Sequence, residues 1–188
     1  MLESIIDFDK QLLLAINGWN SCFFDSVMVC ITNKYAGIPI YAFLLFLIFY
    51  KREWKSAVLM TVSVILAFAL CDSLSVALFK DVFQRMRPCY DPSTEHLVRM
   101  LEYKGGQYGF VSSHAANIFG LAAISSSLLK KRWFTIVIFA WAVFVGYSRV
   151  YVGKHFPLDV ICGALFGMLI GYLVYALYKK VKARYKIN

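Results

Sequence analysis

Residues 56–79 of this chain read SAVLMTVSVILAFALCDSLSVALF. An apolar helix of roughly 20 residues is long enough to cross the hydrocarbon core of a bilayer. Asp72 is the single charged residue in the stretch. We therefore predict that these residues form a transmembrane helix.

The rest of the chain has a similar character. Its 188 residues are 60% hydrophobic and only 16% charged, and the mean hydropathy is +0.63. A soluble domain of this length cannot bury so much apolar surface. We expect an integral membrane protein, and the length indicates one domain that covers residues 1–188.

Four further apolar stretches accompany the first. They are residues 35–50, which can extend backwards into residues 23–32, and residues 112–129, 133–147 and 157–178. Because backbone amides in hydrocarbon must hydrogen-bond within their own segment, each stretch is expected to be helical. The predicted fold is all-α, a polytopic transmembrane helical bundle of five spans, or of six if residues 20–33 form a separate span.

The N-terminal segment is amphipathic. Its apolar residues roughly fit one helical face; they are Leu2, Ile5, Ile6, Leu12, Leu13 and Ile16. The charged residues lie largely off this face; they are Glu3, Asp7, Asp9 and Lys10. This pattern predicts an interfacial helix. The segment has no basic region followed by a small-residue cleavage site, so we expect no removable signal peptide.

The basic residues predict the orientation. Eleven of the twenty lie in residues 51–55, 130–132 and 179–186, which fall on one side if five spans are counted. Short cationic loops stay cytoplasmic, so the C-terminus is predicted to be cytoplasmic and residues 80–111 and 150–156 to lie on the opposite face. These flanks account for much of the net charge of +9, and their ordinary role is to set the topology and to attract anionic lipid headgroups. We therefore expect no nucleic-acid partner.

Other charged residues lie at the opposite helix ends. Taken singly, Arg85, Arg99, Lys104 and Lys154 fit the simple interpretation that they snorkel to lipid headgroups. Six charged or titratable side chains nevertheless converge on this face when they are grouped by loop, namely Lys80, Arg87, His114, Arg149, His155 and Asp159. Two histidines beside three cations and a carboxylate indicate a site for phosphate chemistry.

The local spacing suggests how these residues are used. Proline suits the first turn of a helix, so the sequence HFPLD places His155 just before a helix and Asp159 within its first turn. The carboxylate can then orient the imidazole for attack. Ser112 and Ser113 open another helix, whose N-terminus favours anions, and His114 in that turn is placed to donate a proton.

Three motifs therefore follow one another along the chain. They are Lys80-x6-Arg87-Pro88, Ser112-Ser113-His114, and Ser148-Arg149-x5-His155-x3-Asp159. Together they resemble the signature motifs of the type 2 phosphatidic acid phosphatases, which are membrane lipid phosphate phosphatases related to vanadium haloperoxidases. The second motif departs from the family's P-S-G-H, because Val111 replaces the proline and Ser113 the glycine. This change could slow the enzyme or reshape the pocket, or Ser113 could add a hydroxyl donor.

The resemblance implies a metal-independent membrane phosphatase without a cofactor that hydrolyses the terminal phosphate of a lipid phosphate or pyrophosphate. It implies that His155 is the nucleophile, which forms a phosphohistidine, and that Asp159 is its partner. His114 would protonate the leaving group and then activate water. The phosphate would be bound by Lys80, Arg87, Ser112, Ser113 and Arg149.

Several substrates fit this prediction equally well: undecaprenyl pyrophosphate, phosphatidylglycerol phosphate, phosphatidic acid and lipid A phosphate. The small size favours a bacterial inner-membrane enzyme with its site on the periplasmic face. A lipid phosphotransferase, or a transporter or flippase with the same cationic site, is the alternative. A transporter should show more polar residues deep in its spans, or paired broken helices.

Two features inside the spans need separate explanations. Gly163, Gly167 and Gly171 form a G-x3-G-x3-G ridge that predicts close helix packing inside the bundle, with a dimer face as the alternative. Asp72 lies in hydrocarbon, where carboxylates are costly and often functional. Either a structural hydrogen bond or support of the active site would account for it.

Overall fold

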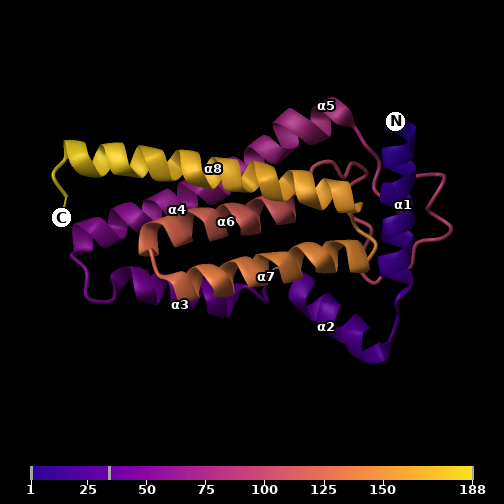
Figure 1. Ribbon diagram of the computed structural model, residues 1–188, viewed down its shortest axis with the longest axis horizontal. Coiled ribbons are helices and arrows are strands. Elements are labelled where there is room, and N and C mark those ends of the chain that lie inside the picture. Colours follow the sequence, from indigo (N-terminus) through magenta and orange to yellow (C-terminus); the bar gives the residue numbers. More distant parts are fainter. Residues whose placement is uncertain (1, 34, 188) are drawn as a thin grey trace.

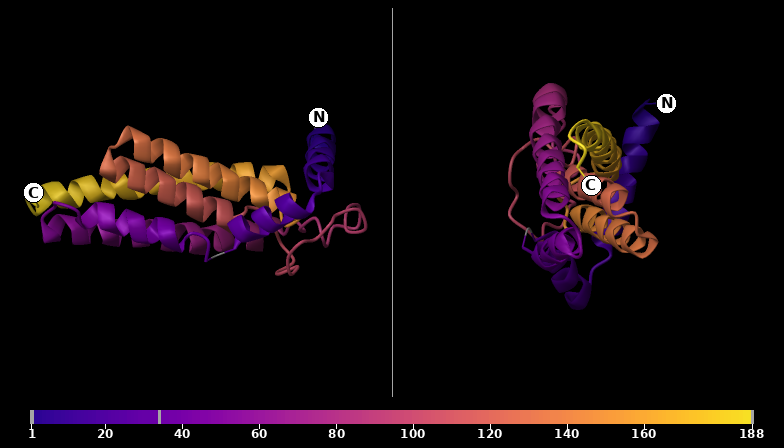
Figure 2. Two further views of the ribbon diagram at one scale, coloured as in Figure 1. Left: turned by 90° about the horizontal axis from the view of Figure 1, so that it is seen from below. Right: turned by 90° about the vertical axis from the view of Figure 1, so that its left-hand side faces the viewer.

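The computed structural model describes residues 2–33 and 35–187, and within these ranges the protein is helical and has no β-strand. Four helices form an elongated bundle, and the two further views show them side by side (Figures 1 and 2): α4 (Trp54–Ser75), α6 (Ser113–Leu129), α7 (Arg132–Tyr151) and α8 (Pro157–Arg184). The prediction of an all-α membrane bundle is confirmed.

Helix α6 is the centre of the bundle, because α4, α7 and α8 all pack against it. The glycine ridge of α8 makes its closest packing possible. A β-carbon at Gly163 would lie 2.6 Å from the carbonyl oxygen of Ser112, and one at Gly171 would lie 2.7 Å from that of Gly120. At Gly167 it would collide with the carbonyl oxygen of Ala116. The predicted packing of this ridge inside the bundle is confirmed.

Three helices are long and apolar enough to cross a membrane: residues 54–83, 132–151 and 157–184. The first of them is α4 continued through a π-helical turn, η1 (Val76–Lys80), into α5 (Asp81–Phe83). The central helix α6 has 17 residues, and α3 (Ile38–Phe49) has 12. The count of five or six spans depends on these shorter helices and stays a prediction.

The expected backward extension of residues 35–50 into residues 23–32 is wrong, because these residues do not form one continuous helix. Helix α2 (Cys22–Thr32) ends before α3 begins at Ile38. Pro39 explains the break, because proline lacks a donor and its ring clashes with the carbonyl group four residues earlier. With 11 residues, α2 is about 16 Å long, so it is too short to cross a bilayer alone.

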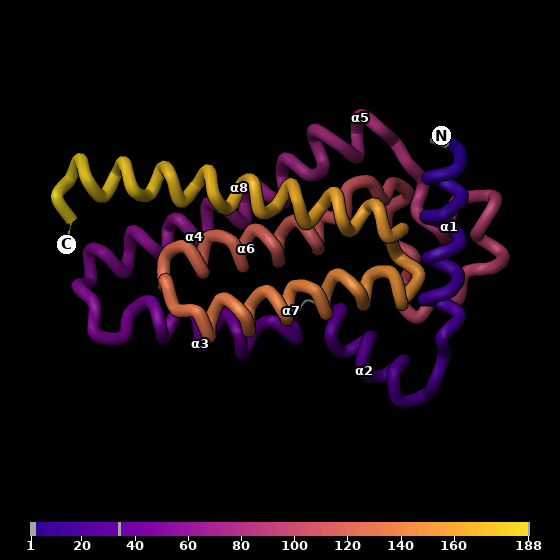
Figure 3. Tube along the Cα trace, in the orientation of Figure 1, coloured from indigo at the N-terminus to yellow at the C-terminus, as the bar shows by residue number. Residues whose placement is uncertain are grey.

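Helix α1 (Leu2–Gly18) lies across one end of the bundle and is bent by 116° from α2 (Figures 1 and 3). The two could together form a fourth span by length and composition. The predicted apolar face is wrong in detail, because the buried residues are Asp9, Leu13 and Asn17, whereas Ile5 and Ile6 are exposed. The side chain of Leu2 lies outside the described residues.

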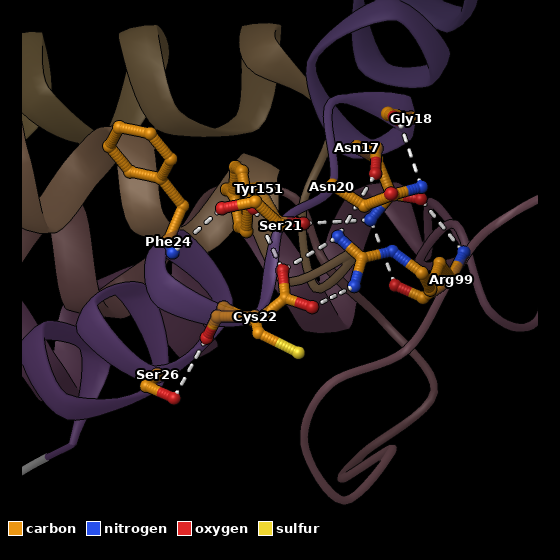
Figure 4. A network of polar contacts seen from close by, with 10 residues as sticks. Asn17, Gly18, Asn20, Ser21, Cys22, Phe24, Ser26, Arg99 and Tyr151 are labelled. Carbon is orange, nitrogen blue, oxygen red and sulfur yellow. Dashed lines mark hydrogen bonds and ion pairs between the residues drawn. The ribbon is translucent and has the colours of Figure 1, made fainter.

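The long loop between α5 and α6 folds back on itself at the same end. The N–H of Arg87 donates to the carbonyl oxygen of Gln107, at 2.9 Å, and the N–H of Gly109 donates to the carbonyl oxygen of Arg85, at 2.8 Å. The middle of the loop is tied to α1 and α7, because the amide of Asn17 bonds the carbonyl oxygens of Arg99 and Tyr151 (Figure 4).

Arg99 also forms an ion pair with Asp25 of α2, with 2.6 Å between Nη1 and Oδ2. The prediction that Arg99 snorkels to lipid headgroups is therefore wrong. Its guanidinium joins α2 to the loop.

Candidate active site

The structure brings the three motifs together at the end of the bundle that α1 crosses (Figure 1). Lys80 ends the π-helical turn, Arg87 lies in the folded loop, and Arg149 is in the last turn of α7. His114 interacts electrostatically with all three of these cations and with His155. Residues that are up to 75 positions apart in the sequence, Lys80 and His155, therefore share one site.

Two neighbouring cavities open at this site. One of about 380 Å³ is lined by Lys80, Arg87, Ser113 and His114, together with other residues of α2, α3, α4, α6 and α7. The other, of about 270 Å³, is lined by Glu102, Arg149 and Lys154 among others, and it shares His114 with the first. His114 is exposed, so its imidazole can reach a ligand from either cavity.

Ser112 and Ser113 play different structural parts. Ser112 is the buried N-cap of α6, and its hydroxyl accepts from the N–H of Ala115 at 3.4 Å. The hydroxyl of Ser113 accepts from Lys80 Nζ at 2.7 Å and lies 2.7 Å from the hydroxyl of Ser75. The serine that replaces the family's glycine is thus a direct partner of a motif cation.

Arg87 is held by weak, neutral acceptors. Its guanidinium donates to the carbonyl oxygens of Tyr108 and Lys104, both at 3.3 Å. Burial lowers its pKa, although an arginine remains charged at neutral pH. No carboxylate pairs with Arg87 in the described part of the chain. Its charge is therefore available to an anion in the cavity that it lines.

Arg149 has partners from two other elements. Its Nη1 donates to the hydroxyl of Thr32 in α2 and lies 3.3 Å from Oε2 of Glu102 in the loop. Lys154 is buried and donates to the carbonyl oxygen of Tyr103, so it does not snorkel as predicted. Glu102 was not singled out in the sequence, because only the fold of the loop brings it to Arg149.

His155 is almost completely buried, with 1% of its surface exposed, and it does not line either cavity. Its Nδ1 lies 3.5 Å from Oδ2 of Asp159, which is beyond hydrogen-bonding distance. Burial, followed by the charges of Arg149 and Arg87, holds the pKa of His155 well below its ordinary value. The imidazole is therefore neutral at physiological pH, as a nucleophile must be.

Asp159 belongs to a buried ionic network that was not predicted. Oδ2 accepts from the N–H of Phe156 at 3.0 Å, and Oδ1 accepts from Arg85 Nη1 at 2.8 Å. Arg85 Nη2 lies 2.7 Å from Oδ2 of Asp9, and Oδ1 of Asp9 accepts from the N–H of Leu158 at 2.9 Å. The prediction that Arg85 snorkels is wrong, because it joins α1 to the first turn of α8.

Two loop glycines also escaped the sequence analysis. A β-carbon at Gly109 would lie 3.1 Å from Oδ2 of Asp159 and 3.0 Å from Cγ of Arg87. One at Gly105 would lie 2.8 Å from Nη1 of Arg87, and its φ of +71° favours glycine. These glycines let the loop lie directly against the site residues. The described residues contain no cluster of histidine, cysteine and carboxylate side chains that could hold a metal ion.

Comparison with known proteins shows the family of this chain. The model of the PAP2 superfamily matches residues 57–183. A lipid A 4'-phosphatase of Bacteroides thetaiotaomicron is 36% identical over 98% of this chain and 83% of its own length. The corresponding values for the lipid A 4'-phosphatase of Porphyromonas gingivalis are 32%, 98% and 78%. An undecaprenyl-diphosphatase of Sulfolobus acidocaldarius is 33% identical over 91% of this chain and 79% of its own.

Two solved structures share the fold. The transmembrane PAP2 type phosphatidylglycerolphosphate phosphatase from Bacillus subtilis has a TM-score of 0.74 at 25% identity, and the match covers 95% of this chain and 88% of that one. Aquifex aeolicus LpxE has a TM-score of 0.64 at 25% identity, over 87% of this chain and 92% of that one.

Proposed function

Because this chain belongs to the PAP2 superfamily and is a membrane phosphatase that acts on lipids, we propose that it hydrolyses the terminal phosphate of a lipid phosphate or pyrophosphate through a phosphohistidine on His155. The observation that supports this most is the gathering of Lys80, Arg87 and Arg149 around two histidines. These three cations, with the hydroxyl of Ser113, would bind the phosphate oxygens and stabilise the transition state. Ser112 would contribute by capping the helix that presents Ser113.

The first chemical step transfers the phosphoryl group to the enzyme. A nitrogen of neutral His155 bonds to phosphorus as the bond from phosphorus to the lipid oxygen breaks, and His114 donates a proton to that oxygen. Nδ1 of His155 faces Asp159 and Gly109, so Nε2 is the nitrogen left for attack. Asp159 stabilises the positive charge that develops on the imidazole.

The second step releases phosphate. His114, now neutral, accepts a proton from water as the water oxygen bonds to phosphorus, and the phosphorus–nitrogen bond breaks to restore neutral His155. The exposed position of His114 between the two cavities suits both proton transfers. This sequence needs no metal ion.

The ends of the bundle support an orientation. Two of the three cationic flanks lie at the links between α3 and α4 and between α6 and α7. Both links are at the same end of the bundle as the C-terminus, which carries the third flank, and opposite α1 (Figure 1). We place this end in the cytoplasm and the site at the outer face of a bacterial inner membrane, because short cationic loops stay inside.

The test is phosphate release by the detergent-solubilised protein in excess chelator, from a panel of lipid mono- and diphosphates. Loss of a charge-assisted contact to the transferring phosphate costs about 2–4 kcal/mol, so Arg87→Ala should lower kcat/KM by about 30-fold to 1000-fold. Lys131→Ala, at the other end of the bundle, is the control and should have no effect. Absence of phosphate release from every lipid, or equal rates for both variants, would overturn the proposal, and a pure transporter would give the first result.

A further inference from the structure

A second polar group lines the larger cavity and has no part in the mechanism above. Asp72 of α4 accepts a hydrogen bond from the amide of Asn117 in α6, at 3.0 Å from Nδ2 to Oδ1. Both residues line the cavity, and Asp72 is exposed to it. Asp72, Val76 and Lys80 follow one another at intervals of four residues, so they share one face of the helix.

The structure indicates how far the Asp72–Asn117 pair lies from Ser113, whose hydroxyl is proposed to bind phosphate. Ser75 and Ser113 touch through their hydroxyls, and Lys80 reaches back along its helix to bond Ser113. The Asp72–Asn117 pair lies three residues before Ser75 on one helix and four after Ser113 on the other. One helical turn is about 5.4 Å, so the carboxylate lies about one turn from the hydroxyl proposed to bind phosphate.

The hydrogen-bonding capacity of Asp72 is only partly used. An ionised carboxylate is an acceptor with about four sites, and in the described part of the chain the side chain of Asp72 has one donor, Asn117. Lys80 and Arg87 do not form an ion pair with it. A carboxylate inside a membrane protein is costly unless further donors reach it. Because Asp72 lines the same cavity as Lys80, Arg87 and His114, the missing donor can come from a lipid whose phosphate binds there.

We propose that Asp72, oriented by Asn117, binds a hydroxyl or amide N–H on the part of the lipid next to the phosphate ester. This inference rests on the proposed function and narrows its substrate class to phosphate monoesters that carry such a donor, such as acylated sugar or amide-linked lipid phosphates. The same carboxylate repels a second phosphate group at that position. Attraction of one class and repulsion of the other both contribute to specificity, and polyprenyl diphosphates, which lack donors, are disfavoured.

The test compares three probes. Ceramide 1-phosphate is a monoester with hydroxyl and amide donors, phosphatidic acid is a monoester without them, and farnesyl diphosphate is a diphosphate without them. Asp72→Asn keeps an acceptor for Asn117 but removes the charge. We expect it to lower kcat/KM for ceramide 1-phosphate about tenfold to hundredfold, to leave phosphatidic acid nearly unchanged, and to raise kcat/KM for farnesyl diphosphate.

Asp81→Asn is the matched control, because Asp81 is exposed on the continuation of the same helix and lines neither cavity. It should change none of the three rates. Asn117→Ala is the second variant, should Asp72→Asn not fold, and it should lower only the rate with ceramide 1-phosphate. An equal loss with all probes would show that the pair only joins two helices, and no loss with any probe would equally overturn the inference. Absence of activity in the wild-type protein would instead overturn the proposed function, and the inference with it.

Discussion

Asp159 contacts charged or titratable groups through both of its carboxylate oxygens. Oδ2 faces His155, and Oδ1 is paired with Arg85, which in turn binds Asp9 of α1. The geometry of the proposed nucleophile therefore depends on a helix more than 130 residues away in sequence. Two buried carboxylates share one guanidinium, so neither carboxylate is compensated without it.

Removal of Arg85 should expose this dependence. Loss of one partner from a buried ion pair costs about 3–5 kcal/mol, so Arg85→Met should lower the melting temperature in detergent and reduce turnover severely. Asp9→Asn added to Arg85→Met should restore part of the stability, because one uncompensated charge is removed. Arg52→Met, at the far end of the bundle, is the control. An Arg85→Met protein as stable and as active as the wild type would contradict this interpretation of the network.

The depressed pKa of His155 leads to a prediction about pH. Protonated imidazole cannot attack phosphorus, so kcat/KM should fall as the pH drops through this depressed pKa, below the ordinary value of about 6.5. The charge of Lys154 is one of the causes of the depression. Lys154→Met should raise the pKa of His155 and move the acid limb of the pH profile to higher pH. The substrate ionises in the same way with the wild type and with Lys154→Met, so a difference between their pH profiles reports on the enzyme alone. An unchanged limb, or a shift to lower pH, would contradict the electrostatic assignment.

Among the elements, α6 and α8 show how directly a sequence pattern can determine packing. The intervals of four residues in the glycine ridge match the helical repeat, and the β-carbon at Gly167 would meet backbone rather than a flexible side chain. The break between α2 and α3 could also have been predicted, since Pro39 is visible in the sequence. The ion pairs of Asp9 and Arg99 could not, because their partners become neighbours only after the loop and α1 have folded.

The packing of α8 on α6 can be tested with one methyl group. Gly167→Ala should lower the free energy of unfolding by about 1–3 kcal/mol or more, because the carbonyl oxygen of Ala116 cannot move without shifting its helix. Thermal unfolding in detergent measures the change. Gly18→Ala is the control, since nothing lies within 4 Å of the added carbon. Equal stability of the two variants would mean that the helices separate easily.

For the molecule as a whole, the sequence alone predicted the all-α membrane fold and the residues that gather at one end of it. Hydropathy and three ordered motifs were sufficient, because each motif occupies a helix end and helix ends meet at the membrane surface. The inner wall of the site could not be predicted. Glu102 and Gly109 belong to a loop whose path is set by pairing between residues 85–87 and 107–109.

The proposed orientation predicts which side of the membrane each end faces. In a background in which the exposed Cys22 and Cys30 are replaced by serine, Lys104→Cys should react with an impermeant thiol reagent added to intact cells. Lys131→Cys should react only after the membrane is opened. Labelling of both from the same side would contradict the topology and the outer-face location of the site.

The phosphohistidine is the central claim, and rapid quenching of the enzyme with phosphate-labelled lipid tests it most directly. A phosphohistidine is stable to alkali and labile to acid, so wild-type protein quenched in excess chelator should retain label under alkaline conditions and lose it in acid. His155→Gln should show neither label nor turnover, whereas His114→Ala should form the label slowly and release it more slowly still. Substantial turnover by His155→Gln in chelator, or label that remains in that variant, would contradict the assignment of His155 as the nucleophile.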